Sequence, residues 1–164
     1  MRSLLLLLPP LFLFLLSCET SPNPEPIEYG KDSCAFCRMI IADAGFAAEL
    51  KTKKGKVYKF DAIECMAAFV LSGQVKREDI LALWVSDFAN KGKLFRVEEV
   101  KFLVSDRLRS PMGLNISAFS NEEDLQVAYR NFGGRILTWN EVLEYVGEKW
   151  KEKISRAGTR QHSH

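Results

Sequence analysis

The pattern of apolar and polar positions divides the chain into four stretches. An almost unbroken apolar block covers residues 4–16, and a polar stretch without apolar periodicity covers residues 18–28. Residues 29–150 mix short alternating segments with segments of helical period, which is typical of one folded domain with a single core. Residues 151–164 are polar again, and we expect them to form a disordered tail.

The apolar block has the features of a secretory signal peptide. Arg2 gives it a positive start, and its length suits a signal peptide but is too short for a membrane-spanning helix. It ends in Leu15-Leu16-Ser17-Cys18, which is similar to the lipobox of bacterial lipoproteins. We therefore expect removal of residues 1–17 and a lipid anchor on Cys18; ordinary cleavage that leaves Cys18 as a free thiol is the alternative. Glu19 is not the Asp typical of retention in the inner membrane, which favours the periplasmic side of the outer membrane.

Prolines at alternate positions mark the polar stretch. Pro22, Pro24 and Pro26 favour extended backbone, at about 3 Å per residue. Residues 18–28 are therefore expected to act as a tether, and the folded domain to begin near Tyr29.

Two segments of the domain resemble each other, one starting at Gly55 and the other at Gly134. In each, the glycine and a basic residue open a β-branched and aromatic strand, and a helix of apolar period follows. The helices are expected at about residues 62–71 and from residue 141 to 146 or beyond. An Asp or Asn precedes each helix as its expected N-cap, and in the first segment it is Asp61.

A further strand is expected ahead of each glycine. It covers residues 46–51 in the first segment and residues 126–129 in the second, although residues 122–132 also fit a helix. Each segment is then expected to form two strands followed by a helix. The predicted fold class is α+β, with duplicated β-β-α units packed as one domain.

The charge balance disfavours one broad class of partner. The chain has 23 Lys and Arg against 21 Asp and Glu, and its formal net charge is +2. Basic and acidic residues are interspersed, without the basic stripe that neutralises phosphates. A nucleic-acid partner is therefore not expected.

Sulfur-bearing residues carry the candidate chemistry. Cys34, Cys37 and Met39 lie within six residues, and Met112 stands alone in Pro111-Met112-Gly113. Thiolate and thioether sulfur prefers Cu(I) to hard cations, because a polarisable donor binds a polarisable d10 ion better than oxygen does. Met39 and Met112 each precede one of the two similar segments. Packing of those segments about a pseudo-twofold axis could bring both methionines to one copper site.

The same residues carry a family resemblance that spans about residues 33–146. The order of motifs resembles that of NosL-family lipoproteins: Cys34 to Met39, Phe60-Asp61 ahead of a helix, Trp84 to Phe88, Pro111-Met112-Gly113, and Gly133-Gly134 followed by Trp139. The resemblance implies a periplasmic copper(I) chaperone, not an enzyme, that serves assembly of the copper centres of nitrous oxide reductase. It also implies a repeated β-β-α fold related to that of organomercurial lyases.

A site and a mechanism follow from the resemblance. It implies Cu(I) bound by Cys37, Met39 and Met112, with Cys34 as a further or alternative thiolate. One cuprous ion would pass by ligand exchange to a partner metalloenzyme such as nitrous oxide reductase. Arg38 departs from the family pattern, which usually has glycine at this position, and its side chain adds bulk and charge beside the site.

Other interpretations of the cysteines remain open. The alternative function is a lipid-anchored thiol-disulfide redox or interaction module without a physiological metal. A simple structural disulfide between Cys34 and Cys37 is also possible. A zinc site would need four closed ligands, whereas the domain offers three cysteines and no histidine. An enzyme is least favoured, because no Asp or Glu is expected in a constellation with the cysteine pair.

Several residues near the motifs have simpler expected roles. Cys65 and Met66 are expected to fill the core, and Asp61 to cap a helix, in preference to binding metal. His162 and His164 are the only histidines. They could capture Cu(II) or assist transfer, but we expect them to lie in an exposed, mobile terminus.

Overall fold

The computed structural model describes residues 21–159. The predictions for the signal peptide, for the lipid anchor on Cys18 and for His162 and His164 fall outside these residues. The described elements are, in chain order, β1 (Ala48–Thr52), β2 (Val57–Phe60), α1 (Ile63–Leu71), a 3-10 turn (Arg77–Asp79), β3 (Ile80–Ser86), β4 (Leu94–Arg96), β5 (Lys101–Val104), β6 (Ile116–Phe119), α2 (Glu122–Phe132), β7 (Arg135–Leu137), α3 (Trp139–Lys149) and α4 (Lys151–Thr159). None of the helices in this part of the chain is both long and apolar enough to cross a bilayer.

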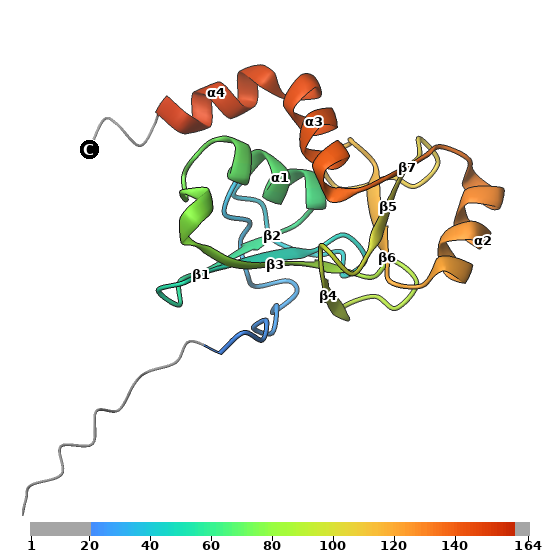
Figure 1. Ribbon diagram of the computed structural model, residues 1–164, viewed down its shortest axis with the longest axis horizontal. Coiled ribbons are helices and arrows are strands. Elements are labelled where there is room, and N and C mark those ends of the chain that lie inside the picture. The colour runs from blue at the N-terminus through green and yellow to red at the C-terminus, as the bar shows by residue number, and fades with distance from the viewer. Residues whose placement is uncertain (1–20, 160–164) are drawn as a thin grey trace, which may run out of the picture.

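The strands form two antiparallel sheets, which confirms the α+β class. The first sheet has the order β2-β1-β3-β4, and the second has the order β6-β5-β7. A parallel bridge between Asp87 and Ala118 links them. In Figure 1, α1, α3 and α4 lie on one side of the larger sheet, and α2 lies at the far end of the smaller one.

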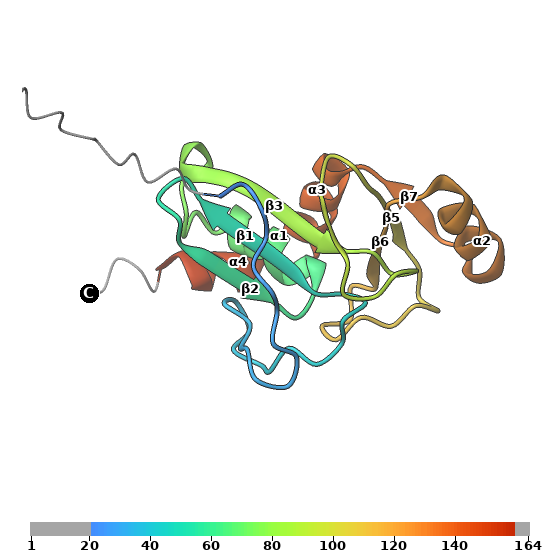
Figure 2. The same ribbon diagram turned by 90° about the horizontal axis from the view of Figure 1, so that it is seen from below.

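The larger sheet is covered on both faces. All five residues of β1 are buried, as expected of a central strand between two layers. On one face lies α1, an apolar helix in which every residue from Ile63 to Val70 is buried. On the other face runs the N-terminal segment that follows residue 20, drawn in blue in Figure 2.

The described end of the predicted tether contacts the folded body. The backbone N–H of Glu25 donates to both carboxylate oxygens of buried Glu49, at 3.0 Å each. The Lys59 ammonium donates to the carbonyl oxygen of Pro26 at 2.7 Å. The expectation that the domain begins near Tyr29 is therefore too late by several residues, because these contacts give the backbone before Tyr29 fixed partners.

The disordered tail expected from residue 151 is wrong for its first nine residues. Residues 151–159 form α4, which packs on α1. Trp150 is buried and Ile154, one turn later, packs against the same core. Two apolar side chains at helical spacing therefore hold a segment that is otherwise polar.

The secondary structure predicted for the second unit is wrong. Residues 126–129, expected as a strand, lie inside α2. Asn121 caps this helix, since its side chain accepts from the backbone N–H of Glu123 at 2.7 Å, and Leu125 and Ala128 lie on its buried face. The competing helical interpretation of residues 122–132 is thus confirmed.

The two sheets nevertheless share one connectivity. In the first, β1 pairs with β2, α1 follows, and β3 returns to pair with β1. In the second, β5 pairs with β6, α2 follows, and β7 returns to pair with β5. Both halves are thus strand-strand-helix-strand units, and the helix that matches α1 is α2. The expected match was α3, which is instead capped at Thr138 by a capping box with Glu141, so that Asn140 lies inside the helix.

Candidate metal centre

The Cys-x-x-Cys motif forms a tight loop at the edge of the larger sheet. Ser33 and Ile40 form an isolated antiparallel bridge at its base, and the backbone N–H of Cys34 donates to the carbonyl oxygen of Met39 at 2.8 Å. The backbone N–H of Ala35 donates to the carbonyl oxygen of Lys59 in β2, at 2.8 Å. The loop is thereby attached to the strand that leads into α1.

Arg38 takes the conformation that makes this turn possible. Its φ is 70°, in the left-handed region, and its backbone N–H donates to the carbonyl oxygen of Cys34 at 3.0 Å. A residue with a Cβ is disfavoured there by about 1–2 kcal/mol, which gives a physical reason for glycine at this position. The turn forms with arginine all the same.

A second wall of the site comes from the junction between β2 and α1. Asp61 follows β2, and Cys65 is the third residue of α1. The expected N-cap role of Asp61 is wrong: the N-cap is Ala62, without any side-chain cap bond. The Asp61 carboxylate instead faces the cysteine loop, where Cys37 Sγ donates to its Oδ2 at 3.4 Å.

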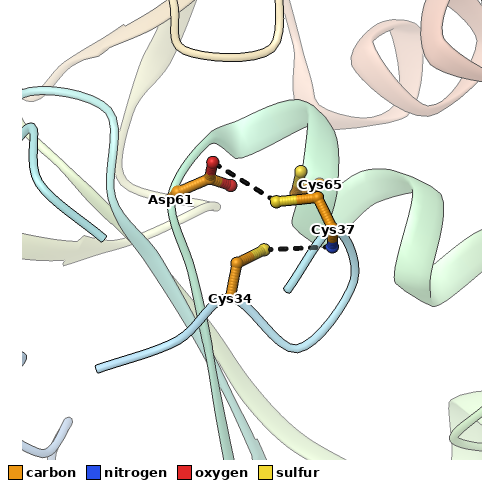
Figure 3. A group of neighbouring side chains, drawn as sticks. All are labelled: Cys34, Cys37, Asp61 and Cys65. Atoms are coloured by element: carbon orange, nitrogen blue, oxygen red, sulfur yellow. Dashed lines mark hydrogen bonds between the residues drawn. The ribbon is translucent and has the colours of Figure 1, made fainter. Parts of the chain in front are cut away.

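Three thiols and one carboxylate therefore meet in one place (Figure 3). The ligand atoms of Cys34, Cys37, Asp61 and Cys65 all lie within 4.8 Å of one another, and the three cysteines are free thiols. Cys65 is buried in the main core, as expected, but its thiol also faces Cys34 and Cys37. The expectation that no carboxylate lies beside the cysteine pair is wrong. A set of four S and O donors at this spacing can surround a single metal ion.

Burial differs sharply among the four groups. Cys34 and Cys65 are fully buried and Asp61 is 1% exposed, whereas Cys37 is half-buried. Asp61 Oδ1 is buried without a hydrogen-bond partner among the described residues. Because an unpaired buried carboxylate oxygen is costly, its position among three thiols fits a site that completes itself with a cation.

The thiols are not equivalent in acidity. The hydrogen bond from Cys65, together with smaller contributions from the Met39 backbone and from Cys34, outweighs burial and lowers the pKa of Cys37 to about 7. Hydrogen bonds with Cys34 and Cys37, together with burial, raise the pKa of Cys65. Of these two thiols, Cys37 is thus the one that ionises first, near the N-terminal end of α1, where the helix dipole favours an anion.

The two predicted methionine ligands have different surroundings. Met39 is 52% exposed beside Cys37. Met112 is partly buried and packs against the main core. Their expected equivalence ahead of two repeats is wrong, because Met39 precedes β1 whereas Met112 lies between β5 and β6.

A buried carboxylate ties the loop of Met112 to the start of α1. Glu64, the residue before Cys65, accepts at Oε1 from the Ser110 hydroxyl and from the backbone N–H of Leu114, the latter at 3.2 Å. The loop is therefore attached to the residue that precedes Cys65, even though Met112 follows Cys65 by more than forty positions in the chain.

The cysteine loop also contacts the C-terminal helices. The ring of Phe36, between the two cysteines, stacks on Trp150 with 6.1 Å between centroids and 5° between planes. Trp150 lies where α3 ends and α4 begins. The segment expected to be disordered thus begins directly after a residue that supports the cysteine loop.

Two known proteins are similar to this chain, one in sequence and one in fold. The chain is 27% identical over 135 residues to the copper-binding lipoprotein NosL of Stutzerimonas stutzeri, a match that covers 76% of this chain and 69% of the relative. The crystal structure of the copper chaperone NosL from Shewanella denitrificans superimposes with a TM-score of 0.65 at 22% identity, over 74% of this chain and 96% of that one. The sequence model of the NosL family matches residues 26–146. The resemblance in the motifs is thereby confirmed, and the chain belongs to the NosL family.

Proposed function

We propose that this chain binds Cu(I) at the cysteine cluster and passes it to a partner protein by ligand exchange. The observation that carries the proposal is the meeting of three free thiols and one carboxylate within 4.8 Å. Soft thiolate donors in a buried site favour Cu(I) over hard cations. The two relatives named above are, by their names, a copper-binding lipoprotein and a copper chaperone, which supports the choice of metal.

The site has a closed side and an open side, as transfer requires. Cys34 and Cys65 lie fully inside, whereas Cys37 is half-buried and Met39 is 52% exposed. A cuprous ion accepts few ligands, so a partner's sulfur can bind from the open side before the inner thiolates release the ion. Met39 would then be the ligand that copper meets first on arrival and last on departure.

Met112 is the second thioether of this proposal. Its loop is attached to Glu64, beside Cys65, and a thioether binds copper without first losing a proton. The proposed ligands are therefore Cys34, Cys37 and Cys65, with Met39 and Met112 as neutral donors and Asp61 as the carboxylate that faces them.

The proposed setting is a bacterial periplasm. The relative from Stutzerimonas stutzeri is named a lipoprotein, and the sequence Leu15-Leu16-Ser17-Cys18 supports lipid attachment at Cys18 here as well. The proposed acceptor is a copper enzyme such as nitrous oxide reductase, which the resemblance to NosL proteins implies. Under this proposal the protein is a carrier of copper and not an enzyme.

Competition for Cu(I) against a chromophoric chelator tests the proposal. The reduced protein should bind one Cu(I) tightly and prefer it to Zn(II), and Met112→Leu should weaken binding. Met66→Leu, at a buried core position, is the matched control and should leave affinity unchanged. Failure of the wild-type protein to compete would overturn the copper proposal, and an unchanged Met112→Leu variant would remove Met112 from the ligand set.

The lowered pKa of Cys37 also favours a second candidate, a thiol-disulfide exchange module. The three thiols lie close enough to exchange partners after a small movement. In that case Cys34→Ser and Cys37→Ser would abolish disulfide exchange with a small thiol, while the wild-type protein would bind Cu(I) only weakly. The same chelator titration therefore separates the two functions.

A further inference from the structure

The loop that carries Met112, residues 110–115, is held together by hydrogen bonds within itself, and we name it the methionine loop. Ser110 Oγ accepts from the backbone N–H of Gly113 at 3.2 Å and of Asn115 at 2.8 Å. The backbone N–H of Ser110 donates to Asn115 Oδ1 at 3.2 Å. Ser110 and Asn115 are both buried. These bonds close the loop on itself and leave Met112 near its tip.

Two of its residues take left-handed backbone conformations. Gly113 has a φ of 85° and Asn115 a φ of 60°. These are the residue types that accept such angles at the lowest cost. The loop therefore has one compact shape, and its position on the protein depends on what the closed ring is attached to.

The attachment runs through Glu64. This side chain is fully buried, and its Oε1 accepts from the Ser110 hydroxyl and from the Leu114 backbone. Both donors flank Met112, one on each side. A buried carboxylate is costly in a helix that otherwise buries apolar side chains, and its other oxygen, Oε2, has no hydrogen-bond partner in the described part of the chain. Packing alone would be served better by an apolar residue.

We propose that Glu64 is a positioning residue for copper binding: it holds the methionine loop against the start of α1 so that Met112 can join the cysteine cluster. The inference rests on the proposed function, because it assigns Met112 to the same site. Glu64 itself is not among the side chains whose ligand atoms meet within 4.8 Å, and both bonds of its carboxylate face the loop. Glu64 therefore affects the affinity for copper only by setting the position of Met112.

A double-mutant cycle on the reduced protein tests this inference. Cu(I) affinity is measured by chelator competition for the wild type, Glu64→Ala, Met112→Leu and the double variant. Glu64→Ala should weaken affinity by about 10- to 100-fold, the usual range for residues that orient a metal ligand. The double variant should be no weaker than Met112→Leu alone, because the two side chains act through one contact. Independent, multiplying effects would overturn the inference.

Two matched variants separate positioning from general damage. Glu64→Gln keeps an amide oxygen that can accept from Ser110 and Leu114, so its affinity should stay near that of the wild type. Glu123→Ala removes the residue at the same place in α2, which is exposed, and should have no effect. If Glu64→Ala does not fold, Ser110→Ala replaces it in the cycle, since it removes the hydroxyl that joins the loop to Glu64.

A measurement without copper gives a second, independent result. The methyl resonances of methionine in the metal-free protein should show a shift of Met112 in Glu64→Ala, with Met39 unmoved and Met112 restored in Glu64→Gln. An unmoved Met112 signal would overturn the positioning role. If the wild type binds no Cu(I), or Met112→Leu binds as the wild type does, the proposed function fails instead. If Met112→Leu weakens binding and Glu64→Ala does not, the positioning role alone fails.

Discussion

Two strand-to-helix junctions of this protein, β2 to α1 and β6 to α2, have the same length, but their side chains serve different ends. Between β2 and α1 lie Asp61 and Ala62, and between β6 and α2 lie Ser120 and Asn121. Each junction follows a strand that ends in phenylalanine, and both N-cap residues have extended backbone. Their side chains, however, make entirely different contacts.

The side chains of the second junction, between β6 and α2, stabilise the fold. Asn121 caps α2, whose first three residues are all acidic and suit the positive end of the helix. Ser120 donates through both its hydroxyl and its backbone N–H to Asp87, the residue that bridges the two sheets. The side chains of Asn121, Ser120 and Asp87 all have hydrogen-bond partners.

The first junction omits these stabilising features and presents reactive groups instead. Helix α1 has no side-chain cap, Asp61 faces Cys37, and Glu64 binds the methionine loop. Cys65 occupies the position that Asp124 has in α2. Sites of function commonly depart from the local rules of stability in this way. The contrast predicts that equivalent substitutions at the two junctions have opposite consequences.

The largest difference is expected between Cys65→Ser and Asp124→Ser. Removing one thiolate from the cluster should weaken Cu(I) binding on the order of 10²–10³-fold, the typical share of one ligand in a small metal site. Asp124→Ser should leave Cu(I) affinity unchanged, because α2 lies apart from the cluster. Chelator competition on both variants checks this. Equal affinities for the two would mean that Cys65 is only a core residue.

Asp87→Asn tests the stabilising role of the second junction. Besides Ser120, the carboxylate accepts from the backbone N–H of Ala89 at 2.8 Å and from Asn90. The neutral amide would lose charge-assisted bonds and turn a donor toward other donors, so the free energy of unfolding should fall by about 2–3 kcal/mol. Urea denaturation of the metal-free protein measures this, and Cu(I) stoichiometry should stay at one.

Asp87 should also make the stability of the protein depend on pH in the acidic range. Burial raises the pKa of Asp87, but the hydrogen bonds from Ser120 and Ala89 outweigh it and leave the pKa below its ordinary value of 3.8. A lowered pKa contributes stability that is present above 3.8 and is lost as the pH falls through the folded-state value. Between pH 4 and pH 2 the wild type should lose stability more steeply than Asp87→Asn. Parallel curves would show that Asp87 is not the ionised hub of this junction.

The sequence predicted β1, β2 and α1 well, but it predicted poorly what Asp61 and Cys65 contact. Helix α1 was expected at residues 62–71 and covers Ile63–Leu71, because an apolar run between strand signals has few other structures. The roles of Asp61 and Cys65 were assigned from what such residues do most often, capping and filling. Their meeting with Cys34 and Cys37 depends on another part of the chain, because the bond of Ala35 to Lys59 brings the cysteine loop to β2.

The second half shows the complementary error. The similarity of the segments at Gly55 and Gly134 led to a repeat that ends in α3, whereas the shared connectivity ends the second unit with α2 and β7. A better signal was present in the pairs Phe60-Asp61 and Phe119-Ser120. A single residue separates each pair from the helix that follows. Short strands of four residues carry too little periodicity for such a choice, and their pairing is decided by long-range contacts.

The acidity of Cys37 tests whether the first junction is chemically active before any metal arrives. Its thiol should ionise with a midpoint at about pH 7, about two pH units below its ordinary value of 9.0. Alkylation of the reduced, metal-free protein over a series of pH values, with peptide mapping, measures this midpoint. Cys65 should remain unreactive over the same range, because its pKa is raised. A midpoint at pH 9 for Cys37 would mean that Cys65 does not donate to it.

The smallest effect is expected from a substitution that makes the second junction resemble the first. Asn121→Ala removes the cap of α2 and leaves alanine at the N-cap position, as in α1, so the free energy of unfolding should fall by about 1 kcal/mol. Asn121→Ser, which keeps an oxygen that can accept from the Glu123 backbone, should restore most of this loss. Cu(I) affinity should be the same in all three proteins. If Asn121→Ala leaves the free energy of unfolding unchanged, a missing cap does not lower stability at such a junction. The reactive side chains at the start of α1 would then be compatible with an ordinary helix start.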